Sequence, residues 1–124
     1  MPTSVLVVDD DPEFRALAVR ILAGMGLTVV GEAGTVEAAT KAAKRLRPES
    51  ALVDVGLPDG DGVTLAGTLA ALPWRPRIVL TSTDPEAITE ATARSAGASA
   101  FIAKHELPGT RLHALLSGLS AEYG

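Results

Sequence analysis

The stretch Ala51-Leu-Val-Asp-Val-Gly-Leu-Pro-Asp-Gly-Asp-Gly62 joins a short apolar run to a lone acid and then to a loop of Gly, Pro and Asp. An apolar run that is bounded at once by turn residues is typical of a buried β-strand. The ionisable Asp54 at the end of this strand is costly to bury unless a cation lies beside it. We therefore expect Asp54 to meet partners from other parts of the chain. The natural candidates are the acids of residues 9–11 and Lys104.

The composition of the 124 residues fits one globular domain over residues 1–124, with 47% hydrophobic and 21% charged residues. The net charge of −4 argues against direct nucleic-acid binding, which depends on Lys and Arg contacts to phosphates. The absence of cysteine excludes disulfides and thiolate chemistry. No apolar segment approaches the roughly 20 residues that span a bilayer, and the first residues lack the charged region of a signal peptide. We therefore expect a cytoplasmic protein that does not bind a membrane.

Short apolar runs alternate with helix-forming segments along the whole chain. Strands are predicted at residues 5–8, 28–30, 51–55, 78–80 and 100–103. Helices are predicted after Asp11-Pro12, over residues 35–47, around residues 65–72, over residues 85–96 and from Pro108, with Leu112, Leu115, Leu116 and Leu119 facing inward in the last one. Five strands that alternate with five helices predict a parallel sheet covered by helices on both faces.

The helix predicted over residues 85–96 has little apolar surface. Asp84 and Pro85 form the same start as Asp11-Pro12, because Asp is a good N-cap and Pro suits the first helical position. Ile88 is the only large apolar residue that follows. Little apolar burial predicts an element that is easily displaced.

Acidic, hydroxyl and basic side chains stand at the ends of four predicted strands: Asp9, Asp10, Asp54, Thr81, Ser82 and Lys104. The carboxyl ends of parallel strands share one edge of a sheet, which is where such sheets bind ligands. Carboxylates that lie close together repel one another. Mg²⁺ would relieve the repulsion, because it takes hard oxygen ligands. With Asp54 as the nucleophile and Lys104 on the phosphoryl oxygens, the set suits phosphoryl transfer.

These residues, in this order and at this spacing, resemble the receiver domain of two-component response regulators over nearly the whole chain. The resemblance is carried by Val7-Val8-Asp9-Asp10, by Asp54 with Leu57-Pro58 and Asp61-Gly62, by Thr81-Ser82, by Gly97-Ala98 and by Phe101-Ile-Ala-Lys104. It implies an α/β fold of the flavodoxin-like kind, with a doubly wound five-stranded parallel sheet, five helices and strand order 2-1-3-4-5.

The resemblance implies that Asp54 accepts a phosphoryl group from the phosphohistidine of a sensor histidine kinase or a phosphotransfer protein. The reaction would need Mg²⁺, held by Asp10, Asp54 and the backbone carbonyl of Gly56. Asp9 would act on the ion through water, and Lys104 would contact the phosphoryl group. Phosphorylation would change the conformation of a surface made by the fourth helix, the fifth strand and the last helix. Only slow self-catalysed phosphorylation and dephosphorylation is implied, so we do not expect an enzyme, and homodimerisation on activation is left open.

Two features depart from the family pattern or leave it open. His105 follows Lys104 where the family often has Pro, which puts the family's cis peptide bond in doubt, since such bonds are essentially a proline property. The switch hydroxyl is either Ser82, which lies 22 residues before Lys104 as in the family, or Thr81, which matches the family's residue type. We favour Ser82. Phe101 is the aromatic residue expected to turn inward.

Asp59 and Asp61 alternate with glycine in the loop after Asp54. A calcium-binding EF-hand loop also has alternating acids, but it spreads its ligands over 12 residues and closes with a Glu. No such set of ligands is in place here, so a tight loop is predicted.

Two other functions fit parts of the pattern. A receiver-like adaptor would hold a partner without phosphorylation, although the complete set of acids argues against it. A Mg²⁺-dependent phosphatase with an aspartyl nucleophile commonly needs a cap or specificity element, for which 124 residues leave no room. Whether the chain is a stand-alone receiver or an excised part of a longer protein with an output domain is open.

Overall fold

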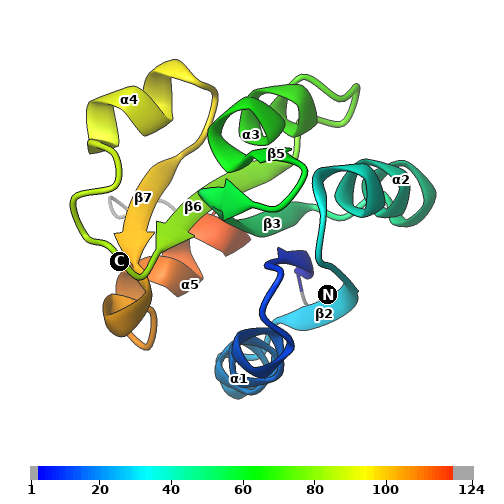
Figure 1. The fold of residues 1–124 in the computed structure, drawn as a ribbon. Helices are drawn as coiled ribbons and strands as arrows, with labels where there is room; N and C mark the ends of the chain where they lie inside the picture. Colours follow the sequence, from blue (N-terminus) through cyan, green and yellow to red (C-terminus); the bar gives the residue numbers. More distant parts are fainter. Residues whose placement is uncertain (1–2, 119–124) are drawn as a thin grey trace.

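The computed structural model describes residues 3–118, and a parallel sheet of five strands lies at its centre. Its strands are β1 (Ser4–Val8), β2 (Thr28–Ala33), β3 (Ser50–Asp54), β6 (Arg77–Ser82) and β7 (Ala100–Ala103). They lie in the order β2-β1-β3-β6-β7 (Figure 1), which confirms the predicted flavodoxin-like order 2-1-3-4-5. Two further short strands, β4 (Gly56–Leu57) and β5 (Gly60–Asp61), form a separate antiparallel hairpin that the sequence pattern does not predict.

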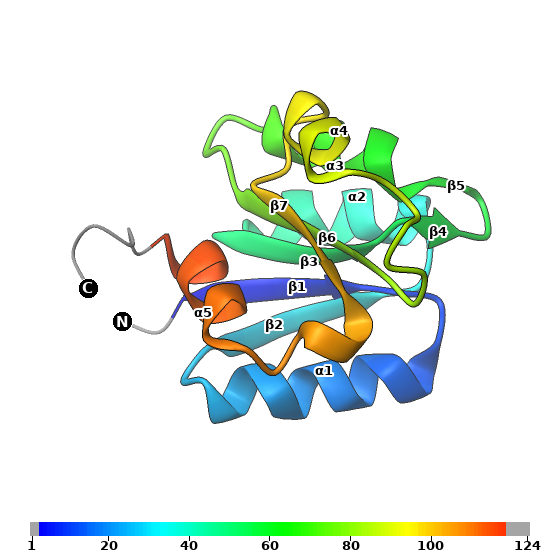
Figure 2. The ribbon, with the colours of Figure 1, turned by 90° about the vertical axis from the view of Figure 1, so that its left-hand side faces the viewer.

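Five α-helices and one short 3-10 helix connect the strands within residues 3–118: α1 (Pro12–Gly24), α2 (Val36–Leu46), α3 (Gly62–Ala70), α4 (Glu90–Ser95), η1 (Lys104–Glu106) and α5 (Thr110–Ser117). Figure 2 shows α1 and α5 on one face of the sheet and α2, α3 and α4 on the other. None of the helices in this part of the chain combines the length and the apolar character that a membrane span requires.

The strand β1 is apolar throughout because helices cover both faces of the sheet. Val5 and Val7 pack with α1 and α5, whereas Leu6 and Val8 pack with α2, α3 and α4. All four side chains are at most 1% exposed. A continuous apolar run is the pattern expected of such a strand. The edge strand β2 instead alternates between exposed and half-buried residues before its buried end at Ala33.

The helix α4 begins at Glu90, so the start predicted at Pro85 is wrong. Asp84 does accept a hydrogen bond from the N–H of Glu86 at 2.8 Å, but this bond closes only a turn. The N-cap is Thr89, whose side chain accepts a hydrogen bond from the third residue of the helix. An Asp-Pro pair therefore starts the long helix α1 but not α4, because no apolar stripe follows it here to hold a longer helix against the sheet.

The last helix α5 begins at Thr110, two residues after the predicted start at Pro108. Pro108 lies in the turn between η1 and α5, and Gly109 is the N-cap residue. Of the leucines predicted to face inward, Leu112 and Leu116 are buried, Leu115 is half-buried, and Leu119 lies outside the described residues.

Candidate functional site

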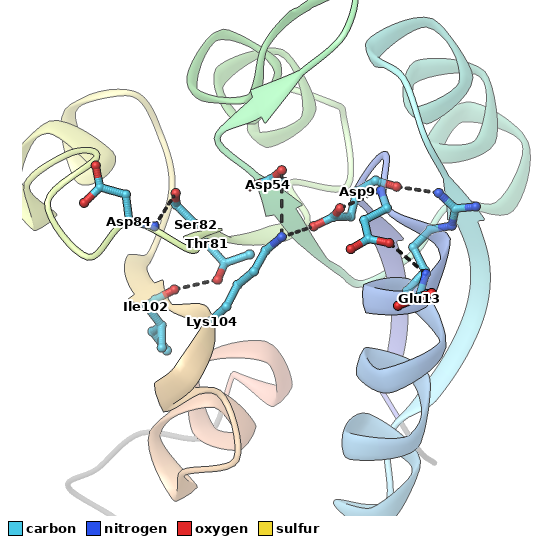
Figure 3. Close-up of polar contacts among 10 residues, drawn as sticks. Asp9, Glu13, Asp54, Thr81, Ser82, Asp84, Ile102 and Lys104 are labelled. Atoms are coloured by element: carbon cyan, nitrogen blue, oxygen red, sulfur yellow. Dashed lines mark hydrogen bonds and ion pairs between the residues drawn. The ribbon is translucent and has the colours of Figure 1, made fainter.

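The residues predicted to form a site meet at the edge where the parallel strands end (Figure 3). Asp9 directly follows β1, Asp54 is the last residue of β3, and Lys104 directly follows β7. Thr81 and Ser82 end β6, and Thr81 is paired with Asp54 in the ladder of the sheet. Parallel pairing thus brings four separate segments to one place.

Three carboxylates crowd this edge. One oxygen from each of Asp9, Asp10 and Asp54 lies within 4.8 Å of the other two. Asp9 is only 1% exposed, whereas Asp10 is open to solvent. Burial, and then the charge of Asp9, raise the pKa of Asp54 from its ordinary 3.8 to about 6, and the Lys104 charge offsets part of the rise. The edge therefore carries more negative charge than its own side chains neutralise.

Lys104 is the cation that faces these acids. Its Nζ lies 2.7 Å from Oδ2 of Asp9 and 4.0 Å from Oδ2 of Asp54, and Figure 3 shows the ammonium between the two carboxylates. The same ammonium lies 4.1 Å from the centre of the Phe14 ring, which adds a cation–π contact. The described part of the chain has no cis peptide bond, so the bond between Lys104 and His105 is trans.

Arg15 of α1 holds the acidic segment in place, a role that the sequence pattern does not indicate. Its Nη1 donates to the carbonyl oxygen of Asp9 at 2.6 Å, and its Nε lies 3.2 Å from Oε1 of Glu32 on β2. The Oδ1 of Asp9 also accepts a hydrogen bond from the N–H of Asp11 at 2.9 Å. Both the backbone and the side chain of Asp9 are therefore fixed. Arg15 and Glu32 are 17 positions apart, so only the fold brings them together.

The two candidate hydroxyls have different neighbours. Thr81 is buried, and its Oγ1 donates to the carbonyl oxygen of Ile102 on β7 at 2.6 Å. Ser82 is half-buried, and its Oγ accepts a hydrogen bond from the N–H of Asp84 at 3.1 Å. The Thr81 hydroxyl thus joins two strands, whereas the Ser82 hydroxyl contacts the loop after β6 (Figure 3). Phe101 is half-buried against the cluster that also contains α2, α3 and α4.

Gly56 begins the hairpin that directly follows Asp54. Its backbone N–H favours the ionised form of Asp54 and is the smallest of the influences on the Asp54 pKa, which it lowers. The tight loop predicted after Asp54 is confirmed, and it takes the form of the β4-β5 hairpin. The carboxylates of Asp59 and Asp61 accept backbone N–H groups at the starts of α2 and α3, which accounts for both acids without a calcium ion.

The side chains at this edge fit a magnesium ion. Mg²⁺ binds through carboxylate and carbonyl oxygens and keeps several of its waters. Within residues 3–118, the three grouped carboxylates have one ammonium in ion-pair contact, that of Lys104. Two negative charges are therefore unmatched when all three acids are ionised, and a divalent cation would balance them.

Comparisons with known proteins identify one family. The family model of the response regulator receiver domain matches residues 5–116. The transcriptional regulatory protein PdtaR of Mycobacterium tuberculosis is 33% identical over 104 residues, which are 84% of this chain and 50% of that protein. The DNA-binding transcriptional activator DevR/DosR of the same organism is 41% identical over 103 residues, which are 81% of this chain and 46% of that protein.

A solved structure leads to the same family. The signal receiver domain of the response regulator NarL from Mycobacterium tuberculosis is 31% identical, with a TM-score of 0.79, and the match covers 99% of this chain and 98% of that one. The chain spans about half the length of the curated relatives that it matches. The strand order, the grouped acids and these matches agree, and the chain belongs to the family of response regulator receiver domains.

Proposed function

We propose that the chain is a phosphorylation-controlled switch of two-component signalling and that Asp54 accepts the phosphoryl group. The observation that carries the proposal is the grouping of three carboxylates within 4.8 Å, with the Lys104 ammonium against two of them. The Asp54 side chain is 13% exposed, so a donor can reach it. Family membership supports a sensor histidine kinase or a phosphotransfer protein as that donor.

Asp54 acts as the nucleophile. One of its carboxylate oxygens bonds to phosphorus while the bond from phosphorus to the donor's imidazole nitrogen breaks, and the imidazole leaves with the electron pair and takes up a proton. Lys104 and the N–H of Gly56 favour the ionised carboxylate that this attack requires.

Mg²⁺ is the proposed cofactor. The carboxylates of Asp10 and Asp54 and the carbonyl of Gly56 would hold the ion, and Asp9 would act on it through water. When bound, Mg²⁺ supplies positive charge against the carboxylates and the phosphoryl oxygens. The chain itself keeps Asp9 buried, paired with Lys104 and tied to Arg15, so that the acids stay grouped.

The bound phosphoryl group would redirect two side chains. Lys104 lies 2.7 Å from Asp9 and 4.0 Å from Asp54, so a small movement takes its ammonium to a phosphoryl oxygen. The hydroxyl of Ser82 would give up its loop contact and donate to another phosphoryl oxygen. Phe101 would then turn inward, and the change would reach the surface of α4, β7 and α5.

The helix α4 suits the role of a moving element. It has six residues, and Ala93 is the buried one. Elements with few buried apolar contacts have low local stability. Glu90 of α4 forms ion pairs with Arg94 and with Arg111 of α5, so a shift of α4 would also disturb a contact of α5. We propose that this surface controls a partner or an output domain. Homodimerisation is one form that this control could take, and the surface does not contact nucleic acid directly.

Intact-mass measurement after incubation with acetyl phosphate tests the proposal. With Mg²⁺ the wild type should gain one phosphoryl group, and without Mg²⁺ it should not. Asp54→Ala should gain none, whereas Asp61→Ala, a control that removes another acid of the same loop, should still gain one. A full gain by Asp54→Ala would show that the nucleophile is another residue.

Two other outcomes would favour the alternative functions. A folded wild type that neither binds Mg²⁺ nor gains a phosphoryl group, even from a phosphorylated histidine kinase, would indicate a receiver-like adaptor. Repeated turnover of a small phosphate ester would indicate a phosphatase with an aspartyl nucleophile.

A further inference from the structure

We infer that Asp59 is a positioning residue for Asp54, because it clamps the hairpin that follows Asp54 to the start of α2. The inference rests on the proposed function, since it concerns how Asp54 and Gly56 are presented to Mg²⁺ and to a phosphoryl donor. Gly56 follows the nucleophile by two positions in the chain, and Gly62, directly after the hairpin, lies against the backbone of Asp54. A shift of the β4-β5 hairpin therefore moves the backbone that directly follows the reacting residue and packs against it.

Asp59 lies at the tip of the hairpin and contacts a different element. Its Oδ1 accepts a hydrogen bond from the N–H of Val36 at 2.7 Å, and its Oδ2 accepts one from the N–H of Glu37 at 3.1 Å. These two N–H groups belong to the first turn of α2, where they have no partner within the helix. The bonds hold the pKa of Asp59 below its ordinary value, with the Val36 bond as the largest cause, so the clamp is fully ionised at neutral pH.

The hairpin is in close contact at its tip and at its base. At the tip, a Cβ added to Gly60 would lie 3.0 Å from Cγ2 of Val36, so α2 lies directly against the hairpin. At the base, the N–H of Gly62 donates to the carbonyl of Val55 at 2.8 Å. A Cβ on Gly62 would lie 1.9 Å from the carbonyl oxygen of Asp54, so only glycine fits there. The segment between is fixed at one end by close backbone packing and at the other by the Asp59 carboxylate.

Two neighbouring caps show that the clamp differs from ordinary helix capping. Within residues 3–118, the hydrogen bonds that the Asp61 carboxylate accepts come from α3, the helix that it immediately precedes. Thr35 caps α2 from within the same segment, by accepting a hydrogen bond from the N–H of Ala38 at 3.0 Å. Asp59 instead bonds to residues that lie 23 and 22 positions before it in the chain, so it couples two elements. Its loss should free the hairpin while the core stays intact, because Asp59 is exposed.

Mg²⁺ titration followed by backbone amide NMR tests the inference on wild type, Asp59→Ala, Asp59→Asn and Thr35→Ala. Asp59→Ala should weaken Mg²⁺ binding about tenfold, as residues that orient metal ligands commonly do. Without Mg²⁺, the same variant should also speed hydrogen exchange of the Gly62 amide. Asp59→Asn keeps one acceptor oxygen and should recover most of both losses. Thr35→Ala removes a cap of α2 only and should bind Mg²⁺ like the wild type.

A role of the Asp59 charge alone would give a different pattern. In that case Asp59→Ala and Asp59→Asn would weaken Mg²⁺ binding equally, and the loss would fade at high salt. Either that result or wild-type affinity in Asp59→Ala would overturn the inference. Asp59→Ser, with one short acceptor, gives the same comparison if Asp59→Ala does not fold. A wild type that fails to bind Mg²⁺ and to gain a phosphoryl group would instead overturn the proposed function.

Discussion

Asp54 is subject to opposing demands. The proposed attack on phosphorus requires the ionised carboxylate, but burial and the neighbouring Asp9 favour the protonated one. Lys104 offsets only part of this, since its ammonium lies closer to Asp9 than to Asp54. Perturbed carboxylates of this kind are concentrated at functional sites. In the metal-free protein, the site should therefore reduce stability at neutral pH.

The stability of the metal-free protein should depend on the protonation of Asp54. Its pKa is about 6 in the folded protein and 3.8 ordinarily, so the folded state holds a proton between those values that the unfolded state releases. The free energy of unfolding should then fall as pH rises from about 4 to about 6. Asp54→Asn should not show this part of the fall. Above pH 6, its free energy of unfolding should exceed that of the wild type by about 1–2 kcal/mol, because solvent screening keeps the gain below the full equivalent of the pKa shift.

Urea unfolding of the two proteins in EDTA, from pH 4.5 to 8, measures this difference. Parallel pH profiles for the wild type and Asp54→Asn would show that Asp54 titrates at its ordinary pKa in the folded protein.

Removal of the Lys104 ammonium should expose the cost of burying Asp9. Lys104→Met leaves a carboxylate that is 1% exposed without its cation. Breaking one partner of a buried ion pair commonly costs about 3 kcal/mol or more. Lys41→Met, which removes an ion pair whose side chains are 76% and 73% exposed, should cost less than about 0.5 kcal/mol. Chemical denaturation compares the two variants, and equal losses would show that Asp9 does not depend on Lys104.

At the scale of the elements, the hairpin meets α3 at Gly62, where the packing leaves no room for a side chain. Gly62 begins α3 and also contacts the backbone of Asp54. Gly24 ends α1 with nothing within 4 Å of an added Cβ. The two glycines therefore have opposite roles, although both lie at helix ends.

Alanine substitutions should separate these roles. Gly62→Ala forces the backbone of Asp54 aside and should lower the free energy of unfolding by about 2 kcal/mol or more, together with Mg²⁺ affinity. Gly24→Ala should raise the free energy of unfolding by about 0.5–1 kcal/mol, because the added methyl group restricts the unfolded chain and meets no clash in the folded one. Thermal unfolding and Mg²⁺ titration of both variants provide the measurement. Normal Mg²⁺ binding by a folded Gly62→Ala would mean that the base of the hairpin does not position the site.

Over the whole molecule, the acidic edge and the tryptophan lie at opposite ends of the sheet. Trp74 precedes β6, its Nε1 donates to the carbonyl of Pro48, and the Arg47 guanidinium lies 4.4 Å from its ring centre. The acids follow the other ends of the strands. Trp74 is therefore expected to respond to unfolding of the domain but not to events at Asp54.

Mg²⁺ should stabilise the whole domain without changing the emission of the folded state. At a concentration of about 100 times its Kd, a ligand that binds only the folded state adds about 2.7 kcal/mol to the free energy of unfolding. Denaturation followed by Trp74 fluorescence should show this gain for the wild type and little of it for Asp54→Asn. A large Mg²⁺-induced change in emission of the folded protein would contradict the separation of the two ends.

The sequence by itself determined the five strands and the polar residues that meet at their ends. Apolar runs that lead into polar residues are a local signal, and the strand ends of a parallel sheet necessarily share an edge, so Asp9, Asp54 and Lys104 could be grouped before the fold was known. The order of the strands followed from the family resemblance. Local propensity failed for α4, where an Asp-Pro start lacked an apolar face to extend it.

Only the tertiary structure decided the contacts that hold the site in place. Arg15 meets Glu32 and the carbonyl of Asp9, and Asp59 meets α2, across separations that no local pattern encodes. The different environments of the two hydroxyls also depend on the fold, since the burial of Thr81 against β7 requires sheet pairing. The residues of the proposed site can thus be recognised in the sequence, whereas their positioning depends on which elements pack together.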